Sequence, residues 1–204
     1  MSKSQLGQDE KVLLFYKKKK NGYFIEIGAS DGINLSNTYL LETQYNWKGI
    51  CVEPIPTIYK ELIANRPKSL CYDNAIYNIS DIIVEFDIAI NDELISGISA
   101  NLDLYKKTVD KNKSTILVKT LSLNDLLDKS NAPTFIEYLS LDTEGSEYEI
   151  LKTFNFNKYT FGLIDVEHNY IEPRRTNIRN LLVSNGYIYI GENKWDDMYK
   201  HSSL

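Results

Sequence analysis

Apolar and polar positions alternate along the chain in short runs that predict strands and helices in turn. Apolar runs typical of buried parallel strands lie at residues 23–27, 47–53, 69–73, 135–141 and 161–167. Amphipathic segments typical of helices lie at residues 6–16, 36–45, 56–65, 122–128 and 172–184. Two closing strands, 187–191 and 195–199, follow the turn at Asn185-Gly186. This alternation predicts a three-layer, Rossmann-like α/β fold with a mostly parallel sheet and a late antiparallel strand.

One segment, residues 81–113, departs from this alternation. Residues 82–90 predict an extended β segment, whereas residues 91–113 are polar and have weak periodicity. Long irregular stretches within a compact domain are often functional loops. We therefore expect one domain over residues 1–204, in which 81–113 is an insertion that contributes to the site for an acceptor substrate.

Composition argues against several classes of protein. The net charge is −5 and the isoelectric point is near 5.2, so a large nucleic-acid footprint is not expected. No apolar stretch approaches the ~20 residues of a membrane helix, and the first four residues lack the apolar core of a signal peptide. No Cys-x-x-Cys motif or Cys/His cluster indicates zinc or redox chemistry. We expect a cytoplasmic protein with no nucleic-acid partner and no membrane span.

The first predicted strand runs directly into the turn Gly28-Ala29-Ser30-Asp31-Gly32. Glycines at both ends permit backbone angles and close approaches that other residues do not. A dinucleotide fingerprint requires glycine where Ser30 stands, so the pyrophosphate of an NAD-linked oxidoreductase is disfavoured. Glu26 would also repel a pyrophosphate, but it suits a cationic cofactor end such as the ammonium and sulfonium of S-adenosylmethionine (SAM).

A second acid, Glu53, ends the next predicted strand. It follows the glycine turn by about 20 residues, the spacing at which an acid can bind a ribose diol. Pro54 cannot extend the strand ladder, so Glu53 is expected at the carboxyl edge of the sheet, where open α/β sheets bind ligands. Asn74 and Ala75 follow the third strand, where an amide could meet the edge of an adenine.

Six motifs, in order and spacing, resemble the FkbM family of SAM-dependent methyltransferases. They are Gln5-x-Gly7-Gln8-Asp9, Phe24-Ile25-Glu26-Ile27-Gly28-Ala29-Ser30-Asp31-Gly32, Ser36-Asn37-Thr38, Trp47-Lys48-Gly49 leading to Glu53-Pro54, Leu141-Asp142-Thr143-Glu144-Gly145-Ser146-Glu147, and Glu167-His168-Asn169-Tyr170. The resemblance covers nearly the whole chain. It implies a class I methyltransferase fold and transfer of a methyl group to a hydroxyl oxygen, commonly of a sugar or a polyketide-like product. The subgroup that this chain resembles is often found among genes for glycan assembly, which implies a glycan acceptor and a fused or cooperating glycosyltransferase.

The glycine turn, the strand ends and the resemblance together define an expected SAM site. Its residues are Gln8, Glu26, Gly28, Ser30, Asp31, Asn37, Thr38, Glu53, Pro54, Asn74 and Ala75.

Acids and a histidine follow the later strands, where the reacting hydroxyl is expected. Because the ends of neighbouring parallel strands converge, Asp142, Glu167 and His168 are predicted to face one reacting centre. Two mechanisms stay open. In one, His168 is a general base that accepts the hydroxyl proton. In the other, the three residues hold a divalent cation, Mg or Mn, that lowers the pKa of the hydroxyl.

Residues just beyond these strand ends are assigned to the acceptor: Glu144, Asn169, Tyr170 and Arg174. Tyr170 and Arg174 could stack on or bond a sugar or a diphosphate carrier. The expected function is SAM-dependent O-methylation of a sugar or glycan hydroxyl. The alternatives are methylation of another small-molecule or lipid hydroxyl, and a non-catalytic module of the same fold.

Overall fold

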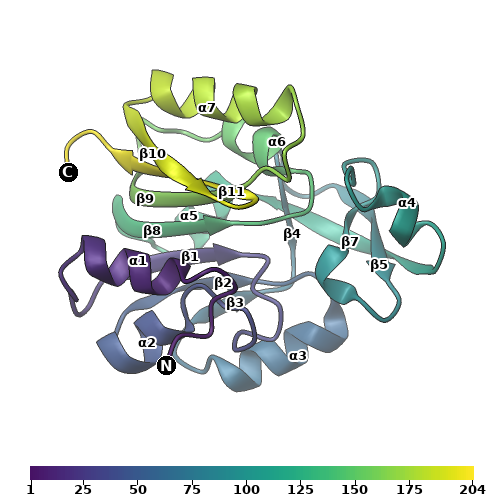
Figure 1. Cartoon of the computed structure of the whole chain (residues 1–204). Helices are drawn as coiled ribbons and strands as arrows, with labels where there is room; N and C mark the ends of the chain where they lie inside the picture. The colour runs from purple at the N-terminus through teal and green to yellow at the C-terminus, as the bar shows by residue number, and fades with distance from the viewer.

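The computed structural model describes residues 1–204 and places seven strands in a central sheet (Figure 1). Across the sheet they are β3 (Leu70–Tyr72), β2 (Lys48–Val52), β1 (Tyr23–Ile27), β8 (Phe135–Leu141), β9 (Thr160–Glu167), β11 (Asp196–His201) and β10 (Tyr187–Asn193). The pairs from β3 to β9 are parallel, and β11 is antiparallel to both of its neighbours. The predicted sheet is confirmed.

Helices cover both faces of the central sheet. One face carries α1 (Gln8–Phe15), α2 (Tyr39–Tyr45) and α3 (Pro56–Asn65), and the other carries α5 (Leu123–Lys129), α6 (Glu147–Lys152) and α7 (Arg174–Ser184). Successive strand residues point to opposite faces. Phe24 of β1 therefore packs with Leu62 of α3, whereas the next residue, Ile25, packs in the cluster that holds Leu182 of α7. The structure has the three layers that the sequence predicts.

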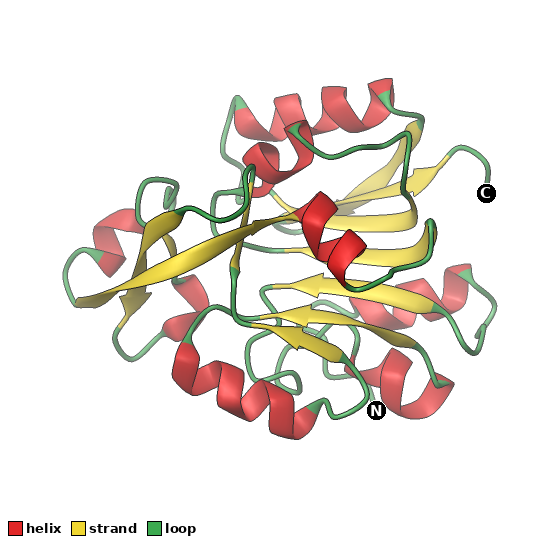
Figure 2. Ribbon diagram, turned by 180° about the vertical axis from the view of Figure 1, so that it is seen from behind, coloured by secondary structure: helices red, strands yellow, loops and turns green.

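A second sheet lies beside the central one, at the right of Figure 1 and the left of Figure 2. Its strands, in order, are β4 (Ala75–Tyr77), β7 (Lys113–Ser122), β5 (Ile83–Ala89) and β6 (Gly97–Ile98). β7 pairs with β4 in parallel and with β5 in antiparallel register. The short helices η1 (Glu93–Ile95) and α4 (Lys106–Val109) complete the segment between β5 and β7.

Residues 91–113 are therefore more regular than their weak periodicity predicts. They contain η1, β6, α4 and the first residue of β7. Elements of two to four residues are too short to show a period of 2 or 3.6, and their conformation depends on tertiary pairing. Ile98 of β6 and Phe86 of β5 pack in one small buried cluster with Val118 of β7.

Side chains cap two of the helices. Ser122 caps α5, because its Oγ accepts the Asp125 N–H. At the start of α2 the backbone N–H groups of Thr38 and Tyr39 both donate to Ser36 Oγ. At α6 the buried Oγ of Ser146 has no hydrogen-bond partner.

None of the helices combines the length and the apolarity that a membrane span requires.

Candidate active site

A cavity of about 330 Å³ opens at the carboxyl edge of the central sheet. Residues at the ends of β1, β2, β8 and β9 line it, together with η1 and β6 of the insertion. Ligand cavities span roughly 300–1,000 Å³, so this one has room for a small-molecule cofactor and the reacting part of an acceptor. Open α/β sheets bind their ligands at this edge.

Most of the predicted SAM residues line this cavity. Those that do are Gln8, Glu26, Gly28, Ser30, Asn37, Glu53, Pro54, Asn74 and Ala75. Asp31 and Thr38 do not. The Asp31 carboxylate accepts the backbone N–H groups of Ile33 and Asn34 and so stabilises the turn after β1. Thr38 is fully buried, and its Oγ1 donates to Glu26.

Gly28 is required by the packing of two strand ends. It has a φ of 83°, and a Cβ there would collide with the carbonyl oxygen of Asp142. The N–H groups of Gly28 and Ala29 both donate to the carbonyl of Val52, at 3.1 and 2.9 Å. A side chain at this position would therefore push the end of β8 away from the end of β1.

Glu26 is buried, and its carboxylate binds the loop that follows the glycine turn. Oε1 accepts the Asn37 N–H at 2.6 Å, and Oε2 accepts the hydroxyls of Ser36 at 2.9 Å and Thr38 at 2.6 Å. We expected this carboxylate to face a cationic cofactor end. The protein's own donors instead occupy its oxygens, so Glu26 acts by fixing the loop that carries Asn37 into the cavity.

Arg66 supplies the charge that balances Glu26. Its fully buried guanidinium lies 3.4 Å from Glu26 Oε2 and 2.8 Å from Glu42 Oε2. It also donates to the carbonyl of Gly32, at 3.1 Å. The sequence gives no sign of this role for Arg66, because nothing in the local pattern separates a buried arginine at the end of α3 from a solvated one.

Glu53 lines the cavity with a carboxyl group that is mostly buried. Burial raises its pKa to about 7, and backbone hydrogen bonds from Ile55 and Ser30 oppose that rise. Oε1 accepts the Ile55 N–H at 2.8 Å. A carboxyl at the end of β2, held in place by backbone donors, is suited to accept hydrogen bonds from the hydroxyls of a ribose.

Three acids form a cluster at the ends of β8 and β9. One oxygen each of Asp142, Glu144 and Glu167 lies within 4.8 Å of the others, and all three residues line the cavity. Glu144 has a φ of 57°, a left-handed conformation that costs a non-glycine residue energy and that brings its side chain to the cluster. Oε2 of Glu167 is buried and has no hydrogen-bond partner.

The surroundings of this cluster raise the pKa of each carboxyl group. Burial, with the charges of Asp196 and Glu147, raises the pKa of Asp142 to about 7. Burial and the nearby Asp142 raise the pKa of Glu144 to about 10 and that of Glu167 well above its ordinary value. Three acids that repel one another in a buried site bind protons or a cation more strongly than isolated acids do.

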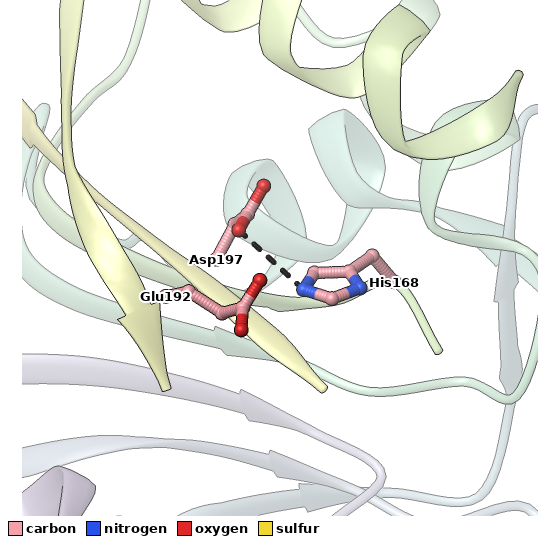
Figure 3. A group of neighbouring side chains, drawn as sticks. All are labelled: His168, Glu192 and Asp197. Atoms are coloured by element: carbon pink, nitrogen blue, oxygen red, sulfur yellow. Dashed lines mark ion pairs between the residues drawn. The ribbon is translucent and has the colours of Figure 1, made fainter. Parts of the chain in front are cut away.

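His168 does not join this cluster, which contradicts the prediction that it faces the same centre as Asp142 and Glu167. It is buried outside the cavity, and its Nε2 lies 3.4 Å from Asp197 Oδ1 (Figure 3). Nδ1 accepts the Tyr170 N–H at 2.9 Å. Adjacent residues of an extended chain point in opposite directions. Glu167 therefore faces the cavity, while His168 points toward β11.

The acids around His168 belong to an ion network. Asp197 binds Arg175 at 2.6 Å and Arg179 at 2.8 Å. Although burial alone would raise the pKa of Asp197, hydrogen bonds from His168 and the two arginines hold it well below its ordinary value. Glu192, the third residue in Figure 3, pairs with Arg175 at 2.6 Å. These carboxylates are occupied by arginines, so they are not free metal ligands.

The predicted acceptor residues separate in the same way. Glu144 lines the cavity, whereas Asn169, Tyr170 and Arg174 do not. Asn169 Nδ2 donates to Glu144 Oε2 at 3.3 Å, so Asn169 helps to position a residue that lines the cavity. Tyr170 is exposed and packs beside His168. Arg174 pairs with Asp103 and, at 3.4 Å, with Glu147.

Several cavity residues carry no signal in the sequence. Asp196 and Trp195 come from β11 and the residue before it, and Gln8 of α1 donates to Asp196 Oδ2 at 2.9 Å. Asp165, inside β9, accepts the hydroxyl of Tyr138 at 2.6 Å. Their positions follow from strand order, because β11 inserts between β10 and β9 and so brings residues near the C-terminus to the first helix.

The methyltransferase FkbM domain matches residues 26–189. The chain belongs to the FkbM methyltransferase family. The match contains the glycine turn, Glu53, the acid cluster and the insertion, so most of the cavity lies within the family domain, and Gln8, Trp195 and Asp196 line it from outside the matched residues. FkbM methyltransferases are SAM-dependent, and SAM is the cofactor that this family membership implies. A comparison with curated proteins gives no match.

Solved structures show the same fold at low sequence identity. The delta-N METTL16 MTase domain has a TM-score of 0.51 at 10% identity, over 97% of this chain and 81% of its own. The human methyltransferase 10 domain containing protein has a TM-score of 0.50 at 9% identity, over 99% of this chain and 85% of its own. The fibrillarin pre-rRNA processing protein of Methanococcus jannaschii has a TM-score of 0.50 at 12% identity, over 90% of this chain and 68% of its own. The fold is that of the Rossmann-like class I methyltransferases.

Proposed function

We propose that this protein is a SAM-dependent O-methyltransferase that acts on a hydroxyl of a sugar or glycan. The observation that carries the proposal is the cluster of Asp142, Glu144 and Glu167, which lines the same cavity as the expected cofactor residues. Oxygen methylation requires a group that aligns the hydroxyl with the methyl carbon. The same group must accept the hydroxyl proton or stabilise the oxygen that loses it. Carboxyl groups at the strand ends supply both needs.

The cofactor half of the cavity has donors and acceptors suited to SAM. Glu53 is placed to accept the ribose hydroxyls, and Asn74 and Ala75 line the side where an adenine would lie. Asn37, fixed by Glu26, presents its amide, whose Nδ2 donates to Ser140 Oγ at 2.9 Å and whose Oδ1 is unpartnered. That free acceptor suits the ammonium of the cofactor.

At the acceptor half, we propose that Mg or Mn is held by Asp142, Glu144 and Glu167, in place of the predicted set that included His168. Hard divalent cations prefer carboxylate oxygens, and the unpartnered Glu167 Oε2 fits such a ligand. A bound cation would supply Lewis-acid stabilisation of the hydroxyl oxygen. In its absence Asp142, whose pKa is raised to about 7, is the carboxyl best matched to accept a proton near neutral pH.

The experiment that tests the proposal measures methyl transfer from labelled SAM to a panel of methyl glycosides and to fatty alcohols. Product from a glycoside supports the sugar assignment, and product from alcohols alone would replace it with the lipid alternative. Titration with SAM separates both from a non-catalytic module. If SAM binds and no hydroxyl is methylated, the O-methyltransferase proposal is wrong.

Glycan assembly also suggests a partner. We propose that a glycosyltransferase, fused or separate, supplies the acceptor. Co-purification with such an enzyme from the native host tests this proposal.

A further inference from the structure

Every charged residue that lines the cavity is acidic. Nine carboxyl groups and no Lys, Arg or His are among its lining residues. The two arginines nearby are already paired: the buried Arg66 with Glu26 and Glu42, and the half-buried Arg174 with Asp103 and Glu147. No cationic side chain is available there to bind a phosphate.

Two of these acids belong to the insertion. Asp92 and Glu93 are exposed at the start of η1, and neither forms an ion pair. Both residues line the same cavity as the acid cluster. An acceptor that enters over η1 therefore meets two negative charges at the rim, and no positively charged side chain deeper in the cavity.

Apolar and aromatic side chains also line the cavity. Leu94, Ile95 and Tyr105 come from the insertion, and Trp195 comes from the turn before β11. Such side chains pack against the C–H faces of an uncharged sugar ring and offer an anion no favourable electrostatic contact. These side chains supply contact area for a sugar ring but no positive charge that could bind a phosphate.

We infer that the acceptor enters as an uncharged saccharide and that a sugar carrying a phosphate or diphosphate next to the reacting ring is excluded. The inference rests on the proposed function and names its substrate class. Asp92 and Glu93, which form no ion pair, repel an anion, and no cationic side chain lines the cavity to bind one. Like-charge juxtaposition is a common means of excluding wrong partners. Tyr170 and Arg174, which the sequence associated with a diphosphate carrier, lie outside the cavity.

This charge selection sets an order of reactions. A glycosyl transfer must come first: the bond from the anomeric carbon to the phosphate oxygen breaks and the diphosphate leaves with the electron pair. A hydroxyl of the growing glycan forms the glycosidic bond and loses its proton to a base of the glycosyltransferase. Methylation then follows on the phosphate-free residue.

Calorimetric titration of the protein with inorganic pyrophosphate and with UDP tests the inference. It is run on the free protein and on the protein loaded with S-adenosylhomocysteine, with and without Mg²⁺. We expect no binding of either anion at millimolar concentration in any of the four states. Binding of pyrophosphate or UDP at micromolar concentration in any of them would overturn the inference.

A double variant, Asp92→Lys with Glu93→Lys, reverses the charge at the rim. We expect it to bind pyrophosphate at least about tenfold more tightly than the parent protein does, as expected for removal of like-charge repulsion. The matched control is Glu85→Lys, on the exposed side of β5 and outside the cavity, which should bind no more pyrophosphate than the parent. No gain in the double variant would contradict the inference.

Methyl transfer completes the test. Methyl glycosides are compared with the 1-phosphates of the same sugars, and we expect product from glycosides at a rate at least about 10²-fold higher. Equal rates would overturn the inference while leaving the proposed function intact. Failure to bind S-adenosylhomocysteine would overturn the proposed function, and the pyrophosphate titration of the free protein would still report on the charge of the cavity.

Discussion

Arg66 Nη1 lies 3.4 Å from Glu26 Oε2 in the interior of the protein, and both side chains are almost completely buried. This pair joins the end of α3 to the end of β1, two segments that are 40 residues apart. Glu26 in turn fixes the loop at Ser36–Thr38 that presents Asn37 to the cavity. The geometry of the cofactor site therefore depends on a residue that does not touch the cavity.

Replacing Arg66 by Met should destabilise the protein by about 3–5 kcal/mol, because Glu26 and Glu42 would lose the partner that balances their buried charges. The free energy of unfolding in urea measures this loss. Lys68→Met is the matched control, since Lys68 is exposed two residues away and forms no ion pair, and its effect should stay within about 0.5 kcal/mol. An Arg66→Met protein as stable as the control would show that the pair is dispensable.

Glu53→Ala should weaken SAM binding by about 1.5–3 kcal/mol, the range for hydrogen bonds to a charged group. Titration calorimetry measures the dissociation constant. Glu61→Ala, on an exposed position of α3, serves as the control and should bind SAM as the parent does. Unchanged SAM affinity in Glu53→Ala would remove Glu53 from the ribose site.

The pH dependence of SAM binding follows from the raised pKa of Glu53. Only the ionised carboxylate accepts both ribose hydroxyls, so affinity should rise as the pH increases through about 7. In Glu53→Gln, whose side chain does not titrate, this rise should disappear. A parent protein with the same affinity at pH 6 and pH 8 would contradict the assignment.

The stability of the cofactor-free protein should change with pH in the opposite sense. The folded-state pKa of Glu53, about 7, lies above its ordinary value of 4.5, so the folded state holds a proton that the unfolded chain releases between these values. Its contribution to stability is present below about pH 4.5 and is lost as the pH rises to about 7, by up to about 3 kcal/mol. The difference in unfolding free energy between the parent and Glu53→Gln, measured at pH 5 and pH 8, isolates this contribution from other groups.

Exhaustive chelation should abolish methyl transfer, and added Mg or Mn should restore it. Asp142→Asn and Glu144→Gln should each reduce turnover by at least about 10²-fold, because each removes a carboxylate ligand. Asn180→Gln, at an exposed position of α7, is a neutral control. Full activity after chelation would leave Asp142 as the general base, and turnover should then rise with pH through about 7.

His168→Asn should reduce stability and leave chemistry nearly unchanged. The imidazole lies outside the cavity and contacts Asp197, which keeps Arg175 and Arg179 as partners. We expect a loss of about 1–3 kcal/mol in unfolding free energy, as for a buried hydrogen-bonding group, with kcat within about threefold of the parent. A fall in kcat of about 10² or more in a folded variant would restore His168 as a catalytic residue.

The sequence by itself determined the central fold. Its apolar runs gave the bounds of β1 and β8, and the amphipathic run at 56–65 gave those of α3. These elements are long enough to show their period, and local chemistry such as the Ser122 cap agrees with tertiary packing. Gly28, Glu53 and Asp142 were found for the same reason, because each follows directly after a strand that the pattern defines.

Only the tertiary structure decided which neighbours of those strand ends face the cavity. Glu167 and His168 are adjacent in the sequence, yet they point to opposite sides, since direction depends on how β9 lies between β8 and β11. Arg66 acquires its role from the loop and helix that close around it. β6 forms because β5 supplies its hydrogen-bond partners, which no local pattern in residues 91–113 specifies.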